Sequence, residues 1–279
     1  METHPRLRSV AVLPSLMTLA NLACGVGALL WLFEAGQNAD YELTRHAGWL
    51  LVLAVFFDAI DGKLARMTKG TSELGAQLDS LADLVTFGVV PAFLVRTLVQ
   101  LEGPVMEIMP HPRLMVAGPI LYSSCAALRL ARFNVLRVDR DETQDHTHFL
   151  GLPSPAAAAL PIGLVLFYFG IADPDFIFPV SEGFIHFFRE STLRMLPFLL
   201  VLLAVLMVSN LPFPHFVAWL TRARHPFQRT AEVVILLSLL FVEPELALFL
   251  LAISFILFPS IAGIIKVFRN RTSQKSESV

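Results

Sequence analysis

Charged residues are scarce in this chain of 279 amino acids. Asp, Glu, Lys and Arg make up only 16% of it, whereas hydrophobic residues make up 55% and the mean hydropathy is +0.65. A soluble globular protein carries a much higher share of charge, so this balance indicates a protein embedded in a membrane. Cysteine is also rare: Cys24 and Cys125 both lie in apolar stretches, which excludes a disulfide framework and a cysteine-based zinc site.

Motifs of several other function classes are missing as well. The sequence shows no glycine-rich nucleotide loop, no nucleophilic triad, no nucleic-acid-binding motif and no internal repeat of clear period. We therefore expect a single integral membrane domain over residues 1–279, and we do not expect nucleic acid as a partner.

Long apolar stretches, in contrast, are plentiful. Stretches that reach or approach the length needed to cross a bilayer lie at 11–33, 47–66, 78–101, 113–135, 154–172, 195–211, 231–243 and 246–266. The last two are separated only by Glu243, Pro244 and Glu245, and a proline between two charges predicts a tight turn. The fold predicted is an all-α, polytopic transmembrane helix bundle of eight spans, with six or seven spans as alternatives.

Basic residues are distributed unevenly between the loops. If the N-terminus is cytoplasmic, 16 of the 21 Lys and Arg residues fall on the cytoplasmic side, and the other side holds only Arg45, Arg96, Arg113, Arg189 and Arg194. Lys and Arg accumulate in cytoplasmic loops, so both termini are predicted to be cytoplasmic in a multi-pass protein of the cell inner membrane. The first apolar stretch is too long for a cleaved signal peptide, and we expect it to be retained.

Four aspartates lie at the ends of two predicted spans, in the segment DAIDGKLARMTKGTSELGAQLDSLAD (58–83). Asp58 and Asp61 are three residues apart, and Asp79 and Asp83 are four apart, so each pair projects from one face of its helix. If the two helices face each other, the four carboxylates need compensation for their mutual repulsion. Hard divalent cations with oxygen ligands supply it. A structural pairing with nearby Lys and Arg is disfavoured, because carboxylates near lipid are costly and usually functional.

The residues between these aspartates suit a phosphorylated substrate. Gly62 and Gly75 flank the cytoplasmic turn, where glycine lets a ligand approach the backbone closely. Arg66 lies one turn beyond Gly62, and arginine can hold phosphate through two parallel hydrogen bonds. The segment therefore predicts a metal-dependent membrane enzyme whose substrate carries phosphate.

This segment resembles the signature of the CDP-alcohol phosphotransferases. All positions of the pattern D-x2-D-G-x2-A-R-x8-G-x3-D-x3-D are filled, by Asp58, Asp61, Gly62, Ala65, Arg66, Gly75, Asp79 and Asp83. The resemblance implies a six-helix core, a homodimer and a binuclear Mg²⁺ or Mn²⁺ site. It also implies that the four aspartates are metal ligands, that Asp83 is the general base, that Gly62, Ala65 and Gly75 line the cytidine nucleotide, and that Arg66 holds phosphate.

On this basis we expect the six-helix catalytic core at 11–211, an additional transmembrane hairpin at 231–266 and a polar cytoplasmic tail at 267–279. The segments PSLMTLANLACG (14–25), DLVTFGVVPA (83–92), ALRLARFNV (127–135) and FLGLPSPAAAA (149–159) further resemble one branch of the family, the bacterial membrane-spanning phosphatidylserine synthases. This resemblance implies that CDP-diacylglycerol donates a phosphatidyl group to the hydroxyl of L-serine, with release of CMP.

Two alternatives to serine transfer stay open at this point. In the first, the reaction is the same and the acceptor is glycerol phosphate, inositol phosphate, choline, or serine on an archaeal-type ether lipid. In the second, the chain is a membrane transporter that uses its carboxylates for ion or proton coupling. The second is weak, because transporters carry such charges near the bilayer midplane and the aspartates here gather at one edge.

Polar residues outside the signature are further candidates for substrate binding. Arg129, Arg132 and Asn134 end the fourth predicted span on the same side as the aspartates. The carboxylate of serine needs cationic donors, although arginines at this depth can also extend toward lipid headgroups. Thr18 and Asn21 lie one turn apart in the first span; they are candidates for nucleotide binding, with hydrogen bonds between helices as the alternative.

Ser154 lies between two prolines at the start of the fifth predicted span. A serine before a proline is ordinary chemistry for the first turn of a helix. We therefore predict a helix cap at Ser154 rather than a nucleophile.

Overall fold

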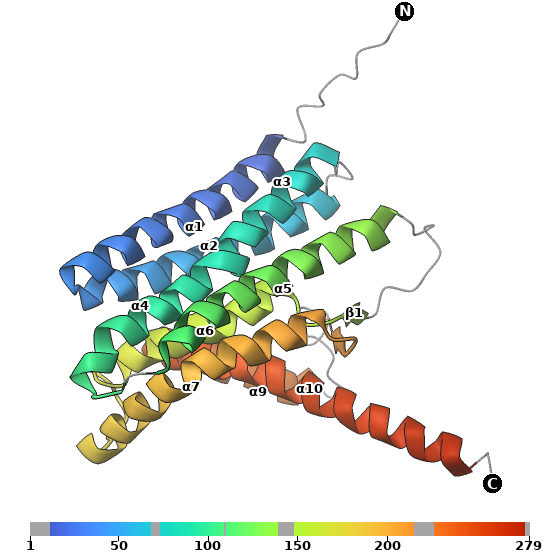
Figure 1. Ribbon diagram of the computed structural model, residues 1–279. Coiled ribbons are helices and arrows are strands. Elements are labelled where there is room, and N and C mark those ends of the chain that lie inside the picture. Colours follow the sequence, from blue (N-terminus) through green and yellow to red (C-terminus); the bar gives the residue numbers. More distant parts are fainter. Residues whose placement is uncertain (1–11, 68–72, 109, 139–147, 215–225, 277–279) are drawn as a thin grey trace, which may run out of the picture.

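The computed structural model describes residues 12–67, 73–108, 110–138, 148–214 and 226–276, and these residues are almost entirely helical (Figure 1). The helices are α1 (Val12–Asn38), α2 (Tyr41–Met67), α3 (Glu73–Asp83), α4 (Val90–Val105), α5 (Pro112–Val138), α6 (Ser154–Gly170), α7 (Glu182–Val208), α9 (Pro226–Val242) and α10 (Pro244–Ser276). A six-residue π-helix, η2 (Leu84–Val89), joins α3 to α4 without a break. Two short strands, β1 (His148–Leu150) and β2 (Pro212–Pro214), pair in antiparallel fashion.

The prediction of an all-α, polytopic membrane protein is confirmed. Each predicted span falls on a helix, with α3, η2 and α4 together forming the third. Within the described ranges, 5 helical segments are long and apolar enough to cross a membrane: Leu13–Asn38, Leu74–Val105, Pro112–Val135, Glu182–Val208 and Pro244–Ile261. The helix α6 is apolar but shorter. The chain is therefore a multi-pass membrane protein.

Helix ends follow from local side-chain chemistry. Asp40 precedes α2, and its Oδ1 accepts hydrogen bonds from the N–H groups of Glu42 and Leu43 at 2.9 and 3.2 Å. Ser181 caps α7 by accepting from the N–H of Phe184 at 3.3 Å. Each cap satisfies amide groups that have no partner inside the helix.

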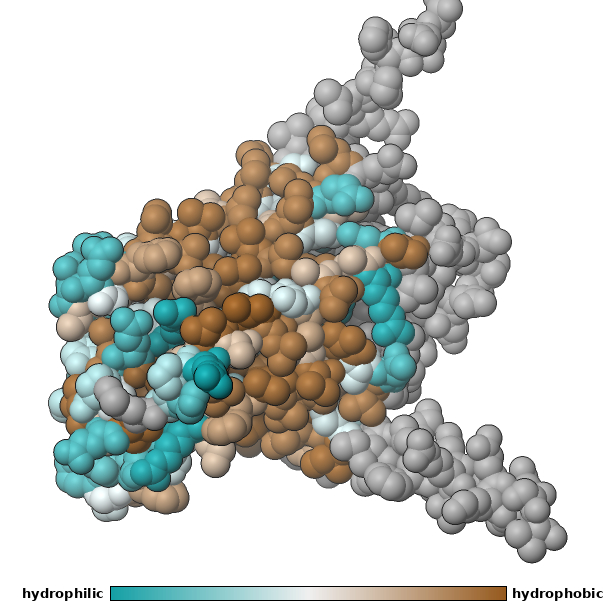
Figure 2. All heavy atoms as spheres, viewed as in Figure 1, coloured by the Kyte–Doolittle hydropathy of each residue, from teal (hydrophilic) through white to brown (hydrophobic). Residues whose placement is uncertain are grey.

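Short and apolar α6 is central to the packing. It contacts α2, α4, α7 and α10, while α1 packs along α2 and α5 along α7. Its residues Leu166 and Tyr168 are fully buried, as are Leu51 of α2 and Leu98 of α4. The outward side chains of the surrounding helices are largely apolar, and Figure 2 shows them as a hydrophobic band with hydrophilic residues toward both of its ends.

The C-terminal helix packs closely against this centre. A Cβ atom at Gly163 of α6 would lie 3.1 Å from the backbone of Phe249 in α10, and the rings of Phe167 and Phe249 stack with centroids 5.4 Å apart. The predicted turn between the last two spans is confirmed at Glu243, where α9 has ended and α10 begins at Pro244. The helix α10 continues to Ser276, so the first residues of the predicted polar tail are helical.

Two groups of paired charges lie at the end of the bundle where α2 begins and α4 ends. In the first, Arg45 Nε donates to Glu245 at 2.9 Å and Arg45 Nη2 lies 3.3 Å from Asp173. In the second, Glu102 accepts from Arg189 at 3.0 Å and from the hydroxyl of Tyr168 at 2.9 Å. These contacts connect helices that are far apart in the sequence.

Candidate active site

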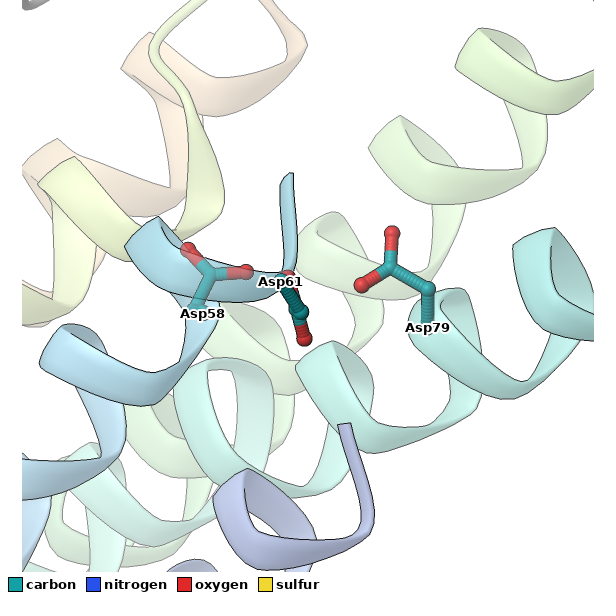
Figure 3. A group of neighbouring side chains, drawn as sticks. All are labelled: Asp58, Asp61 and Asp79. Atoms are coloured by element: carbon teal, nitrogen blue, oxygen red, sulfur yellow. The ribbon is translucent and has the colours of Figure 1, made fainter. Parts of the chain in front are cut away.

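At the other end of the bundle, three aspartates come together. Asp58 and Asp61 lie near the end of α2, and Asp79 lies in α3. One carboxylate oxygen from each residue can be chosen so that all three lie within 4.8 Å of one another. Figure 3 shows the two residues of α2 on one side and Asp79 reaching toward them from α3. The facing helices expected from the spacing therefore do bring these carboxylates together.

Asp83, one helical turn after Asp79, lies beside this group. Its side chain interacts directly with that of Asp58 and lies in the electrostatic field of Asp61 and Asp79. Asp83 is 8% exposed, and Asn21 Nδ2 donates a hydrogen bond to its Oδ1 at 3.4 Å. All four predicted carboxylates are thus neighbours, and Asp83 is more deeply buried than Asp79.

The first helix contributes polar groups to the acids. The hydroxyl of Thr18 donates to Asp61 Oδ2 at 3.1 Å, and Asn21 contacts Asp83. Both side chains of α1 are buried, Asn21 completely. Within the described part of the chain, Asn21 Oδ1 is a buried oxygen without a hydrogen-bond partner. These two residues therefore bond between helices, and they do so at the acid cluster.

A π-helix follows the cluster immediately. It begins at Leu84, directly after Asp83, and such segments occur frequently at functional sites. The hydroxyl of Thr86 donates to the carbonyl of Asn21 at 3.4 Å, and the buried hydroxyl of Tyr122 donates to the carbonyl of Phe87 at 3.1 Å. The wider turn of the π-helix rotates the side chains of α3 relative to those of α4. The two hydrogen bonds hold the π-helix in place.

Close packing on α1 supports the same arrangement. A Cβ atom at Gly25 would lie 2.4 Å from the hydroxyl oxygen of Thr86 and 3.0 Å from its Cα. Only glycine therefore allows the π-helix to approach α1 this closely. Neither Tyr122 nor the π-helix could be identified as part of the site from the sequence, because an inserted residue in a helix leaves no periodic signal.

The prediction of a helix cap at Ser154 is wrong. Pro153 occupies the cap position of α6, and its carbonyl accepts from the N–H of Ala157 at 2.8 Å. The completely buried Ser154 hydroxyl instead accepts a hydrogen bond from Nη1 of Arg129. The residue after Ser154 is Pro155, which has no N–H to offer.

Of the arginines predicted to bind substrate, Arg129 lies at the cluster. Its guanidinium interacts electrostatically with Asp58 and Asp83. Arg132 is exposed, and its Nη2 donates to Asn210 Oδ1 at 3.0 Å. Asn210 follows the end of α7, and it was not among the residues predicted to bind substrate.

Asn134 is also placed near the acids by its partner. Its Nδ2 donates to Ser80 Oγ at 3.1 Å, and Ser80 directly follows Asp79 in α3. Sequence reasoning missed Ser80, although its position beside a predicted metal ligand was a usable signal. The contact holds the end of α5 against α3.

The predicted nucleotide-binding residues lie around the turn after α2. Gly62 is exposed, and a Cβ atom there would meet no other atom within 4 Å, so packing inside the chain does not demand glycine. Gly75 lies partly buried in the first turns of α3. The side chains of Ala65 and Arg66 lie outside the described residues.

The acid cluster has the chemistry of a divalent cation site. Its donors are carboxylate oxygens from two helices, which hard cations such as Mg²⁺ and Mn²⁺ prefer. The buried oxygen of Asn21 beside them has no partner among the described groups. Within that same part of the structure, the Arg129 guanidinium interacts electrostatically with Asp58 and Asp83. The residues therefore fit a bound cation.

Comparisons with known proteins agree with this geometry. Residues 11–188 match the family described as CDP-alcohol phosphatidyltransferase. The chain is 32% identical over 235 residues to a CDP-diacylglycerol–serine O-phosphatidyltransferase of Helicobacter pylori, covering 84% of each chain. Proteins of the same name from Mycobacterium tuberculosis and Bacillus subtilis are 34% identical over 158 residues and 29% identical over 204 residues. The match to the mycobacterial protein covers 56% of this chain and 50% of that protein. The match to the Bacillus protein covers 73% of this chain and 90% of that protein.

Proposed function

This chain belongs to the CDP-alcohol phosphatidyltransferase family, and we propose that it transfers a phosphatidyl group from CDP-diacylglycerol to L-serine. The products are phosphatidylserine and CMP. The observation that carries the proposal is the gathering of Asp58, Asp61 and Asp79 within 4.8 Å at one end of a membrane helix bundle. The names of the relatives support serine as the acceptor.

The acid cluster would hold two divalent cations, Mg²⁺ or Mn²⁺. Asp58, Asp61 and Asp79 would be ligands from the three-residue group, and Asp83 would join them from the next turn of the helix. When bound, the cations neutralise the diphosphate of the donor and stabilise the charge that develops on departing CMP. Thr18 orients Asp61 through its hydrogen bond of 3.1 Å.

Asp83 would act as the general base. It accepts the proton of the acceptor hydroxyl, whose oxygen then attacks the phosphorus that carries the diacylglycerol. Asn21 Nδ2 donates a hydrogen bond to Asp83 Oδ1 at 3.4 Å, and this bond restrains the direction of the carboxylate. A base needs hydrogen-bond reach and orientation, and the contact with Asn21 supports the orientation.

Donor and acceptor would be recognised by groups around the cluster. The space beside Gly62, with Ala65 and Gly75, is the proposed site of the cytidine nucleotide, and Arg66 is the proposed phosphate ligand. Arg129 lies nearest the acids and suits an anionic group of either substrate. Arg132 and Asn134, which lie on the same helix, are proposed to contact serine.

We propose that the cluster faces the cytoplasm and that the protein resides in the cell inner membrane. The basic residues of the loops support this orientation, since 16 of the 21 Lys and Arg residues fall on the side predicted to be cytoplasmic from the sequence. The catalytic core would span 11–211, with α9 and α10 as an additional hairpin. A homodimer is proposed from the family resemblance.

An acceptor panel tests the reaction and its specificity. Purified protein in detergent receives CDP-diacylglycerol and Mn²⁺ with serine, glycerol 3-phosphate, inositol phosphate or choline, each alone. We expect phosphatidylserine, identified by mass spectrometry, only in the serine reaction. A lipid product with another acceptor would keep the reaction class and replace serine, whereas no product with any acceptor would reject the proposed function.

A further inference from the structure

A buried hydroxyl beside the acid cluster has no part in the reaction described above. Ser154 Oγ accepts a hydrogen bond from Arg129 Nη1, and Ser154 is 0% exposed. The helix that Ser154 begins does not need this hydroxyl, because the Pro153 carbonyl already accepts from the N–H of Ala157. The Ser154 hydroxyl is therefore used by Arg129 and not by its own helix.

The backbone fixes the position of this hydroxyl. Just before Ser154, the N–H of Gly151 donates to the carbonyl of Leu211 at 2.9 Å. Gly151 has φ of +83°, and a Cβ atom there would lie 2.4 Å from the carbonyl oxygen of Met207 at the end of α7. Only glycine fits both conditions. The strand β1, which pairs with β2, ends at Leu150 directly before Gly151. The backbone that leads to Ser154 is thus held by several contacts, so Ser154 is a rigid anchor.

Arg129 lies between this anchor and the acids. Its guanidinium interacts electrostatically with Asp58 and Asp83, and among the described residues its one hydrogen bond goes to Ser154. Opposite charges attract strongly where water is excluded. Without the anchor, the guanidinium would move onto the two carboxylates and compete with a cation for them.

We propose that Ser154 is a positioning residue that holds Arg129 beside the acid cluster without letting it close onto Asp58 and Asp83. The carboxylates then stay available to a divalent cation. The remaining N–H donors of Arg129 face an oxyanion of a substrate, either the phosphate of the donor or the carboxylate of the acceptor. The kinetic part of this inference rests on the proposed function, whereas the part that concerns cation binding does not.

The first test measures Mn²⁺ binding to the purified full-length protein by electron paramagnetic resonance. Ser154→Ala should weaken binding by about tenfold, the effect of losing one hydrogen bond to a charged group. Arg129→Ala should not weaken it, because a competing cation is removed. The double variant should bind like Arg129→Ala alone. If Ser154→Ala weakens binding equally in both backgrounds, Ser154 acts on the fold and not through Arg129, and the proposal is rejected.

The second test separates the two substrates. In Ser154→Ala, KM should rise for whichever substrate Arg129 contacts: for serine if it holds the carboxylate, and for CDP-diacylglycerol if it holds the phosphate. Unchanged KM values together with unchanged Mn²⁺ binding would overturn the proposal. Ser254→Ala is the matched control, since this hydroxyl bonds the carbonyl of Leu251 within α10, and it should match the wild type.

Two further outcomes are covered by the design. If Ser154→Ala does not fold, Ser154→Cys keeps the size of the side chain with a weaker acceptor and should shift Mn²⁺ binding in the same direction. Wild-type Mn²⁺ affinity in that variant would overturn the proposal. If the wild-type protein forms no lipid product with any acceptor, the proposed function fails, and the Mn²⁺ measurements on the three variants still decide the role of Ser154.

Discussion

The two ends of the helix bundle treat their charged residues in opposite ways. Where α2 begins, acids are matched with arginines: Arg45 contacts both Glu245 and Asp173, and Glu102 contacts Arg189. Where α2 ends, four aspartates lie together, and the Arg129 guanidinium interacts electrostatically with Asp58 and Asp83. In the first set each acid lies beside an arginine, whereas in the second set the acids lie beside one another.

This difference separates structural from functional charges. An acid that is hydrogen-bonded to an arginine of another helix connects the two helices. Neighbouring acids repel one another when they are ionised, and a bound cation relieves that repulsion. In a family that transfers phosphate-bearing groups, a divalent cation is the natural partner for the second set.

The largest expected effect is at the acid cluster. Asp83→Asn keeps the size of the side chain and removes the proposed base, so turnover should fall by about a thousandfold. Thermal unfolding should change little, because Asn21 can still contact the side chain. The measurement is CMP release under saturating substrates, with Asp175→Asn, an exposed position at the other end, as control. Full turnover in Asp83→Asn would refute the assignment.

The end with the paired charges should respond in stability instead. Arg189→Met leaves Glu102 buried without its cationic partner and should cost about 3 kcal/mol of unfolding free energy. Glu102→Gln should cost less, since Arg189 has a 22% exposed side chain and can turn to water. Combining the two should recover part of the loss. Thermal unfolding in detergent measures this, and turnover of the folded fraction should remain near that of wild type.

Recognition of the acceptor should show a smaller, selective effect. Arg132→Ala should raise KM for serine by about tenfold, corresponding to the loss of one charged hydrogen bond, with a smaller change for CDP-diacylglycerol. Asn210→Ala removes the partner of Arg132 and should cause a weaker change in the same direction. Substrate titrations of CMP release provide the comparison. An unchanged ratio of the two KM values would count against a serine contact.

The smallest expected effect concerns the π-helix. Tyr122→Phe removes the hydroxyl that donates to the carbonyl of Phe87 at 3.1 Å. Loss of this buried bond should destabilise the segment by about 1 kcal/mol, and kcat should fall by a few-fold because Asp83 directly precedes it. Cys125→Ala in the same helix serves as the control. A wild-type kcat would show that Asp83 does not depend on this bond.

The sequence was most informative where the chemistry is local. The spacing of Asp58, Asp61, Asp79 and Asp83 determines which helix faces they share, and a helix keeps that spacing in the fold. The turn at Glu243 was equally predictable, because proline and adjacent charges interrupt a helix by their own properties.

Long-range contacts were beyond the reach of the sequence. Arg45 and Glu245 are 200 residues apart, so no local pattern marks them as a pair. Ser154 was predicted to be a cap because its neighbours are prolines, but its partner Arg129 lies on another helix. The apolar stretch predicted to span the membrane begins at 195, but α7 begins at Glu182. Arg189, Glu190 and Arg194 interrupt the apolar stretch without interrupting the helix.

The requirement for a cation at the acid cluster is the central claim, and CMP release before and after metal removal tests it most directly. Wild-type protein is assayed with CDP-diacylglycerol and serine, then with excess EDTA, then with Mn²⁺ restored. We predict serine-dependent release that falls to background with EDTA and returns with Mn²⁺. Release that persists at full rate in EDTA would contradict the account, because the four neighbouring aspartates would then work without the cation that we propose they hold.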